Sequence, residues 1–395
     1  MTENVIILGA GFSYDAGIPL LGGFIERMWE CATRKTIEGK PIRPEILKTL
    51  NEALEIRREL DNYHGRVVFD DRNIEDILSM LAFNILGGGK ADSNKFKIFT
   101  KAISETIELA CNVKHTGYRS DGRYTAIKEG DKVYREFWQG IFKWYKKTGS
   151  IPTIISFNYD LVLERSLMQI LISDENFNPY ENPLPFNGVT LDYCYKHFPS
   201  KSYLVEYANY NSPRQSQSTG TIISQPAGLD IEKFCKINIL KLHGSLNFPT
   251  DSKKTASLVT PIDQPYILPP VSNKHSNGAG SQSWKSALNC LREAKNVTFV
   301  GYSLPKTDMY MQFFLKAALG PNQDLNKINI FDPVLSKDNQ VSLDMKNRFQ
   351  SCFSEQIRPR LNFNPGQSEY GSKNEQGTTK KFVDILNHTP ELILF

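Results

Sequence analysis

The chain has 395 residues, of which 40% are hydrophobic and 23% charged, and its formal net charge is +4 at pH 7. This composition is that of a globular protein, and it excludes a disordered chain, a collagen and a coiled-coil rod. The near-balanced charge gives no argument for nucleic-acid binding, and the length allows about two or three domains. Because the N-terminus has no basic start and no apolar run approaches the ~20 residues of a membrane span, we expect a cytosolic protein without membrane contact.

The first predicted element is a buried parallel strand at residues 5–8, which runs directly into the segment GAGFS. Gly9 and Gly11 would let the backbone approach a phosphate closely, and a following helix would offer free N–H groups. The full dinucleotide fingerprint G-x-G-x-x-G fails, however, because residue 14 is tyrosine. Taken alone, this loop fits a tight turn without a ligand equally well.

Helical patterns dominate from about residue 24 to residue 147. After Asn73 the apolar residues fall at i, i+3, i+4 and i+7, which predicts one buried helical face, with Asn73 as the N-terminal cap. Residues 134–145 carry a broad aromatic stripe. We interpret that stripe as core packing and not as a base-stacking or cofactor face.

Strand patterns return in the second half of the chain, each ending in a small or polar cluster. These runs lie at residues 153–156, 237–242, 296–300 and 328–331. Helical patterns separate some of them, for example at residues 161–172. The alternation predicts an α/β protein with an open, Rossmann-like parallel sheet. In such sheets the ligand lies at the carboxyl ends of the strands, near a topological switch point.

The domain organisation that follows is a Rossmann-like domain formed by residues 1–24 and 151–335. A large helical insertion, or second helical subdomain, is expected at residues 25–150. Residues 336–395 are expected to form a C-terminal extension with a polar loop at residues 364–380. Its apolar tail would pack on the body of the protein or on a neighbouring subunit.

The cysteines are scattered, and the two that are closest in sequence are Cys194 and Cys235. No C-x-x-C pair occurs, so the sequence carries no structural zinc signature and we expect no metal. Buried, unpaired thiols are the expected state of these side chains.

Four motifs in order resemble those of the sirtuin family. Residues 9–19 read GAGFSYDAGIP and match the sirtuin opening motif G-A-G-x-S-x-x-x-G-I-P at every fixed position. Residues 241–245 (KLHGS) resemble the catalytic histidine motif of the sirtuin family. Residues 157–164 (FNYDLVLE) and 301–308 (GYSLPKTD) resemble motifs of sirtuin-like proteins in bacterial antiviral defence. The resemblance covers roughly residues 1–335.

The resemblance implies that NAD binds to this chain as its substrate. The residues that it assigns to the pyrophosphate and nicotinamide end are Gly9, Ala10, Gly11, Ser13, Ile18 and Pro19. Gly301 and Ser303 would line the phosphates and the ribose. Asp332 would lie near the adenosine ribose, where its two oxygens could accept from two hydroxyls.

The resemblance also implies the catalytic residues. Cleavage of the nicotinamide–ribose bond gives an oxocarbenium-like ribose and a neutral leaving group, so no strong general acid is needed. His243 would bond a ribose hydroxyl and take a proton, and Asn158 would orient the attacking water or the amide. Asp160 would hold the nicotinamide amide or support the positive centre, with a helix cap as its alternative role. We expect Asp308 to cap the next helix and Glu164 to orient its neighbours.

Several departures separate the chain from classical sirtuin deacylases. LLGGF follows Pro19 where they carry D-F-R, and their four-cysteine zinc module is missing. These changes favour an NAD+ glycohydrolase that depletes NAD+ in antiphage abortive infection, a branch of which the NIE at residues 73–75 is also typical. Activation would come from a HerA-type ATPase/helicase partner, with a homo-oligomer as the active state. The alternatives are an NAD-dependent protein deacylase and a non-catalytic NAD- or ADP-ribose-binding regulatory subunit.

Overall fold

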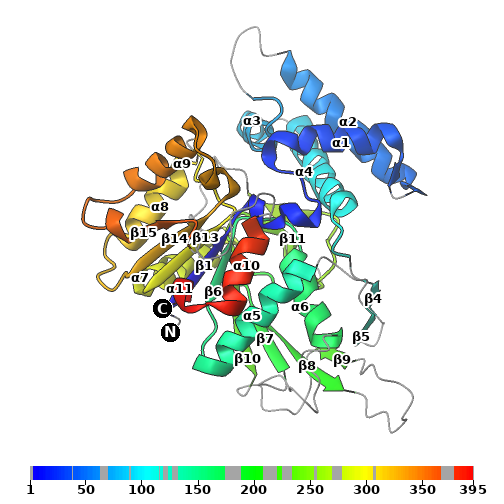
Figure 1. The fold of residues 1–395 in the computed structure, drawn as a ribbon. Coiled ribbons are helices and arrows are strands. Elements are labelled where there is room, and N and C mark those ends of the chain that lie inside the picture. The colour runs from blue at the N-terminus through cyan, green and yellow to red at the C-terminus, as the bar shows by residue number, and fades with distance from the viewer. Residues whose placement is uncertain are drawn as a thin grey trace.

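A computed structural model gives the fold of most of the chain. It describes residues 3–37, 39–62, 70–88, 90–114, 116–118, 123–126, 132–173, 188–207, 220–224, 234–252, 256–268, 278–305, 308–365 and 378–394. Figure 1 shows a central twisted sheet flanked by helices, with a separate group of helices beyond one edge.

The centre of the protein is an eleven-stranded sheet in the order β15-β14-β13-β1-β6-β10-β7-β8-β9-β5-β4. Its parallel part consists of β15 (Leu361–Phe363), β14 (Lys327–Phe331), β13 (Asn296–Val300), β1 (Asn4–Leu8), β6 (Thr153–Ser156), β10 (Cys235–Lys241) and β7 (Gly188–Asp192). The antiparallel part continues through β8 (Lys201–Tyr207), β9 (Gly220–Ser224), β5 (Arg123–Ala126) and β4 (Thr116–Tyr118). The predicted Rossmann-like α/β class is therefore confirmed.

The predicted strands occur where the apolar runs indicated. β6 and β13 begin and end at the predicted residues, and β1, β10 and β14 differ from the prediction by one or two residues at one or both ends. All five are buried along most or all of their length, because helices cover both faces of the parallel part of the sheet. Alternate residues serve opposite faces, so Ile6 and Leu8 join one apolar core while Val5 and Ile7 join the other.

The first strand marks the topological switch point of the sheet. β1 lies between β13 and β6, and the chain proceeds from it to β6 and β10 on one side. It then returns to β13, β14 and β15 on the other side of β1. The loop after β1 is consequently flanked by the loops after β6 and β13.

Two groups of helices cover the sheet. On one face lie α5 (Lys132–Thr148), α6 (Val162–Ser173) and α10 (Thr378–His388), in mutual contact through α5. On the other lie α7 (Ser281–Glu293), α8 (Met309–Leu319) and α9 (Gln340–Ser351), whose apolar residues form the second core. The aromatic stripe predicted at residues 134–145 lies in α5 and is buried except for Tyr145, which is partly buried, as core packing requires. Among the described helices, none has both the length and the apolar character of a membrane-spanning helix.

The predicted insertion at residues 25–150 divides into two parts. α1 (Phe24–Arg34), α2 (Pro44–Asp61), α3 (Ile74–Leu86) and α4 (Lys90–Ala110) form a helical layer, with the small hairpin of β2 (Thr36–Ile37) and β3 (Lys40–Pro41). Figure 1 shows this layer beyond the edge at which β1 ends. β4, β5 and α5 instead belong to the sheet body, because β5 pairs with β9 and α5 packs on α6 and α10.

The C-terminal extension also belongs to the sheet body. β15 adds a strand beside β14, and α10 packs against α5 and against the 3₁₀ helix η1 (Ala10–Ala16). The apolar tail folds as α11 (Glu391–Leu394), and its Ile393 and Leu394 are buried on the body. Of the loop predicted at residues 364–380, residues 366–377 lie outside the described residues, and α10 begins at Thr378.

Both predicted helix caps are confirmed. The Asn73 side chain accepts a hydrogen bond from the Glu75 N–H at 2.9 Å, at the start of α3. The Asp308 Oδ1 accepts one from the Met311 N–H at 3.1 Å, at the start of α8. The six cysteines are unpaired, and four of them are buried.

Candidate functional site

The predicted site residues gather at the carboxyl ends of five adjacent strands. Gly9 follows β1, Asn158 follows β6, His243 follows β10, Gly301 follows β13 and Asp332 follows β14. Strands that run parallel end at the same edge of a sheet, so the fold brings these residues together. Their ligand roles remain predictions.

Three glycines make the junction at the switch point. A Cβ placed on Gly9 would lie 2.5 Å from the Gly301 carbonyl oxygen, and one on Gly11 would lie 2.8 Å from the Gly301 Cα. Gly301 has a φ of +64°, and its own Cβ would lie 2.4 Å from the Phe12 nitrogen. The loops after β1 and β13 can therefore meet only because none of the three positions carries a side chain.

This junction also determines how the glycine N–H groups are used. Gly9 donates its N–H to the Val300 carbonyl at 3.0 Å, and Gly11 donates to the Gly301 carbonyl at 2.9 Å. Both groups are thus used within the protein, and neither is available to a phosphate. The glycines contribute close packing of two loops, while Ala10, between them, is exposed.

Asn158 ties the loop after β6 to the loop after β1. Its Nδ2 donates to the Gly9 carbonyl oxygen and to the Ser13 Oγ, both at 2.9 Å. Asn158 and Ser13 are buried, so these bonds are shielded from water. The amide donors are used in this way, which leaves the Asn158 Oδ1 as the atom that can accept from a water or a hydroxyl.

His243 lies in an aromatic environment at the end of β10. Its ring centroid is 5.0 Å from that of Phe157, 6.5 Å from that of Tyr159 and 6.4 Å from that of Trp284. The side chain is 5% exposed. In the parallel pairing of β10 with β6, Lys241 lies opposite Ser156. His243 follows Lys241 by two residues, and Asn158 follows Ser156 by two residues.

A buried ion pair joins the motif at residues 157–164 to the motif at residues 241–245. The Lys241 Nζ lies 3.0 Å from the Glu164 Oε1, and the two side chains are 1% and 0% exposed. Lys241 also donates to the Asp160 carbonyl and to the Ser245 Oγ, and Tyr193 donates to the same Glu164 oxygen at 2.8 Å. Glu164 therefore orients its neighbours, as the sequence predicted, and it does so through Lys241.

Asp160 adopts the alternative role that the sequence left open. Its Oδ1 accepts from the Val162 N–H at 3.0 Å, which caps the start of α6. The side chain is 6% exposed. A carboxylate engaged in this cap has less capacity to hold a nicotinamide amide.

The G-I-P part of the first motif is held by the helical layer. The Asn112 N–H, just beyond α4, donates to the Ala16 carbonyl at 2.8 Å. A Cβ on Gly17, whose φ is +82°, would lie 2.7 Å from the Ala110 carbonyl oxygen. Ile18 is buried in the hydrophobic core that the helical layer shares with the sheet body, and Pro19 is half-buried. The end of α4 thus sets the course of the chain through these residues.

Asp332 and Ser303 lie at the opposite end of the site, near Arg348 of α9. The guanidinium of Arg348 donates to the Ser303 carbonyl at 3.3 and 3.2 Å, while the Ser303 side chain is exposed. Burial raises the pKa of Asp332, whereas the Val334 N–H that it accepts and the charge of Arg348 act in the opposite direction. Arg348 is a cationic neighbour that the sequence motifs did not indicate, since it belongs to no strand end.

Arg165 is a second residue that the motifs did not mark. It is buried in α6 and binds the Glu108 carboxylate through Nη2 at 2.9 and 2.8 Å. Its Nη1 donates to the Val113 carbonyl and its Nε to the Val259 carbonyl. An arginine directly after Glu164, in a helix whose other residues are mostly apolar, was the available signal.

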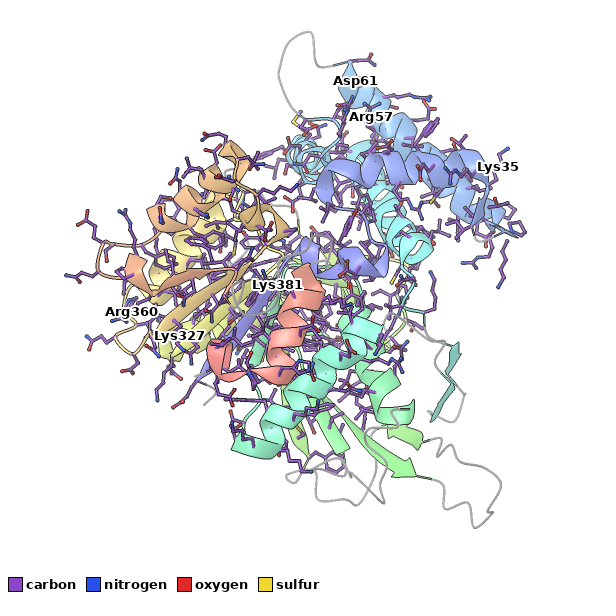
Figure 2. The ribbon with its side chains drawn as sticks, in the orientation of Figure 1. Lys35, Arg57, Asp61, Lys327, Arg360 and Lys381 are labelled. Carbon is purple, nitrogen blue, oxygen red and sulfur yellow. The ribbon has the colours of Figure 1, made fainter. Side chains whose placement is uncertain are left out.

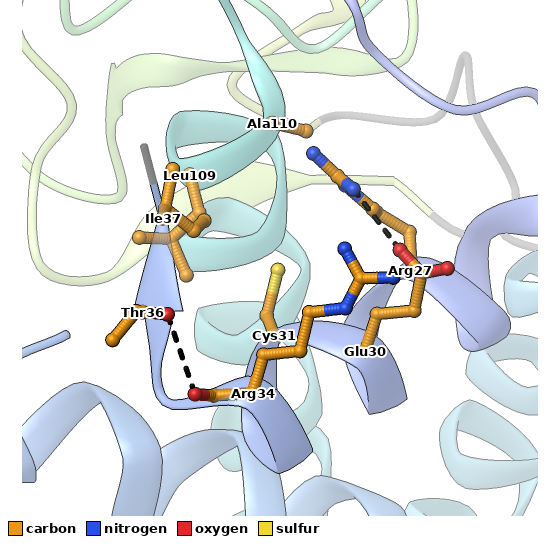
Figure 3. Close-up of a pocket in the computed structure, with 8 residues that line it drawn as sticks. All are labelled: Arg27, Glu30, Cys31, Arg34, Thr36, Ile37, Leu109 and Ala110. Atoms are coloured by element: carbon orange, nitrogen blue, oxygen red, sulfur yellow. Dashed lines mark hydrogen bonds and ion pairs between the residues drawn. The ribbon is translucent and has the colours of Figure 1, made fainter. Parts of the chain in front are cut away.

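A separate hollow of about 160 Å³ lies in the helical layer (Figure 3). Its lining comes from α1, β2 and the end of α4: Arg27, Glu30, Cys31, Arg34, Thr36, Ile37, Leu109 and Ala110. Arg27 is paired with Glu30 at 3.0 Å, and burial raises the pKa of Cys31. Ligand pockets usually measure about 300–1,000 Å³, so this hollow is too small for a dinucleotide. No predicted site residue lines it.

Comparison with models of known protein families gave no match, and a search of curated proteins gave none. The arrangement offers a protonatable imidazole, an amide acceptor and a loop at the switch point of an open α/β sheet. Among the described residues, no three His, Cys, Asp or Glu side chains gather as metal ligands.

Proposed function

We propose that this protein is an NAD+ glycohydrolase, which cleaves NAD+ to nicotinamide and ADP-ribose. The observation that carries the proposal is the position of Asn158 and His243. They follow the neighbouring strands β6 and β10, each two residues after the last paired residue of its strand. Asn158 is bonded to the loop after β1, which lies at the switch point where open α/β sheets bind ligands. Further support comes from the order of the four motifs, which resembles that of sirtuin-like NAD-hydrolysing proteins.

In the proposed reaction the bond from ribose to nicotinamide breaks toward an oxocarbenium-like centre. The bonding electron pair returns to the nicotinamide nitrogen, which leaves as a neutral group. The Asn158 Oδ1 holds a water molecule. The oxygen of this water bonds to the ribose carbon, and its proton passes to His243. The buried aromatic rings around His243 limit the access of other water, and positioning supplies much of the rate.

The test is NAD+ turnover by the purified protein, followed through release of nicotinamide and ADP-ribose. His243→Ala and Asn158→Ala should each lower the rate by about 100-fold or more. Asn158→Ala removes the Oδ1 that would hold the water, together with the Nδ2 donors. Unchanged turnover in both variants would overturn the site.

Other results would point to the alternatives. Nicotinamide release that depends on an acylated lysine peptide would identify a deacylase. Tight NAD or ADP-ribose binding without turnover under any trigger would identify a regulatory subunit.

The cellular role that we propose is depletion of NAD+ in the cytosol during antiphage abortive infection. Activation would depend on a HerA-type ATPase/helicase and on a homo-oligomeric state. This part is supported by the resemblance of the motif set, including the NIE at residues 73–75. Co-purification with such an ATPase, followed by NAD+ assays with and without it, tests the partnership. Absence of both a complex and a rise in turnover would remove the ATPase from the proposal.

A further inference from the structure

The hollow of Figure 3 lies in the helical layer, and none of the strand ends that carry the candidate site contributes to its lining. Its volume of about 160 Å³ is close to that of a protein cavity that holds one benzene molecule. A ligand of about six non-hydrogen atoms therefore fits the hollow.

One face of α1 brings two arginines to this hollow. Arg27, Cys31 and Arg34 fall at i, i+4 and i+7, so successive turns direct these side chains to the same side of the helix. The small hairpin closes the hollow on another side. Lys35, labelled in Figure 2, ends α1 with a φ of +55° and turns the chain into β2, which places Thr36 in the lining.

Both arginines keep donors that no residue of the lining uses. Arg27 pairs with Glu30 through Nη1 at 3.0 Å, while its Nε is buried and has no hydrogen-bond partner within the described part of the chain. No residue drawn in Figure 3 pairs with the Arg34 guanidinium. Buried polar atoms are nearly always bonded, so the Arg27 Nε points to an acceptor from outside the chain.

The charge of the lining matches a single negative charge. Two guanidinium groups and the one carboxylate, that of Glu30, leave a net charge of +1. Burial raises the pKa of the Cys31 thiol, so this neighbour stays neutral. Arg34 lies in the last turn of α1, and Ala110 ends α4. The carbonyl ends of these two helices disfavour a second negative charge on a ligand.

A carboxylate suits this set of groups, because its two oxygens can accept from two guanidinium groups at once. A phosphate group carries a charge of about −1.5 to −2 at pH 7, which exceeds the positive charge of the lining. We propose that this hollow binds a small monocarboxylate, whose short apolar part lies against the Ile37 and Leu109 side chains. This inference goes beyond the proposed NAD+ hydrolysis and does not depend on it.

The end of α4 links this hollow to the first motif. Ala110 lines the hollow, and its carbonyl oxygen would lie 2.7 Å from a Cβ placed on Gly17. Asn112, two residues later, donates its N–H to the Ala16 carbonyl at 2.8 Å. A ligand in the hollow holds the end of α4 in place, so it should also steady residues 16–19 and slow the exchange of the Asn112 amide hydrogen.

Butyrate is the probe, and titration calorimetry of the full chain without NAD measures its binding. Butyrate should bind at least about 10-fold more tightly than inorganic phosphate or butylamine. Arg27→Gln and Arg34→Gln should each weaken butyrate binding by at least about 10-fold. Arg58→Gln is the matched control, since Arg58 pairs with Glu55 at 2.6 Å with the same i,i+3 spacing but lies outside the lining. It should bind butyrate as the wild type does.

Glu30→Gln tests the charge match directly. The substitution removes the one negative charge of the lining, so the affinity for inorganic phosphate should rise by at least about 10-fold. Butyrate should gain less, because it carries a smaller charge. A gain for butyrate as large as that for phosphate would contradict the charge match.

The outcomes decide the inference without any measurement of NAD+ turnover. Absence of butyrate binding, or equal binding by the wild type and Arg34→Gln, overturns it. Arg34 is exposed, so this variant should fold. A capped glutamate peptide is the other source of a carboxylate, and tighter binding of the peptide than of butyrate would overturn the assignment to a free acid. Unchanged hydrogen exchange at Asn112 with butyrate bound would overturn the link to residues 16–19.

Discussion

The Thr379 Oγ1 donates a hydrogen bond of 2.9 Å to the Phe12 carbonyl, 367 residues earlier in the sequence. The Tyr134 hydroxyl donates to the same oxygen at 2.8 Å. Thr379 and Tyr134 are fully buried, and the Phe12 ring packs edge-on against those of Tyr134 and Phe137. Helices from two distant parts of the chain therefore hold the loop that follows β1.

Removing these hydroxyls should loosen the loop without changing its sequence. Thr379→Val and Tyr134→Phe should each cost about 1 kcal/mol of unfolding free energy. The double variant should cost more than the sum of the two, because either donor alone still bonds the carbonyl and only the double variant removes both. Denaturant unfolding of the four proteins measures this coupling. Strict additivity would show that the two bonds act independently.

Removing one member of the ion pair of Lys241 and Glu164 should lower the free energy of unfolding far more than removing both members. Lys241→Met leaves a buried carboxylate unpaired and should cost about 3–5 kcal/mol. Adding Glu164→Gln to it should restore a large part of that loss. Denaturant midpoints of the wild type, both single variants and the double variant provide the test. A double variant as unstable as the sum of the single variants contradicts the pairing.

The glycine junction should tolerate no side chain at Gly301. Gly301→Ala combines a left-handed φ with a contact of 2.4 Å to the Phe12 nitrogen, so the loops after β1 and β13 must separate. The φ alone costs about 1–2 kcal/mol, and we expect NAD binding to be lost. Gly22→Ala is the control, since nothing lies within 4 Å of its Cβ. Equal NAD affinity in both variants would refute the junction's importance.

Asp332 should make stability fall as the pH rises. Its pKa in the folded protein is raised by burial, so between the ordinary and the raised value the unfolded chain loses the proton first. Asp332→Asn stays neutral and keeps an oxygen for the Val334 N–H. Its Tm should therefore exceed that of the wild type at pH 7 and match it near pH 3.

The same variant separates the ribose role of Asp332 from its structural one. If Asp332 binds the adenosine ribose, Asp332→Asn should weaken NAD binding by roughly 10-fold even while it raises Tm. Calorimetric titration with NAD at pH 7 measures this. Unchanged affinity would restrict Asp332 to capping the 3₁₀ turn that follows it.

Buried parallel strands were the most predictable part of the fold. β6 and β13 are continuous apolar or β-branched runs between polar residues, because helices cover both of their faces. β7 alternates polar and apolar residues, β8 begins with two polar residues, and β15 is three residues long, so their sequences carried too weak a pattern.

The site was predictable in its residues but not in its contacts. Strand ends and motifs named Asn158 and His243, yet their relative position depends on the register of β6 and β10. The pairing of Lys241 with Glu164 likewise depends on how α6 packs beneath β10. Thr379 lay in a stretch so polar that it predicted a loop, and only tertiary packing places it against Phe12.

The position of β1 in the sheet has a consequence for synthesis on the ribosome. β1 is made long before β13, one of its two neighbours, which begins at Asn296; the Asn296 Nδ2 donates to the Asn4 Oδ1 at 2.9 Å. Chains fold from the N-terminus as they emerge, and contacts so distant in sequence form late. The glycine junction therefore cannot exist until Gly301 has been translated, and a nascent chain that ends before Gly301 lacks the contact between the loops after β1 and β13.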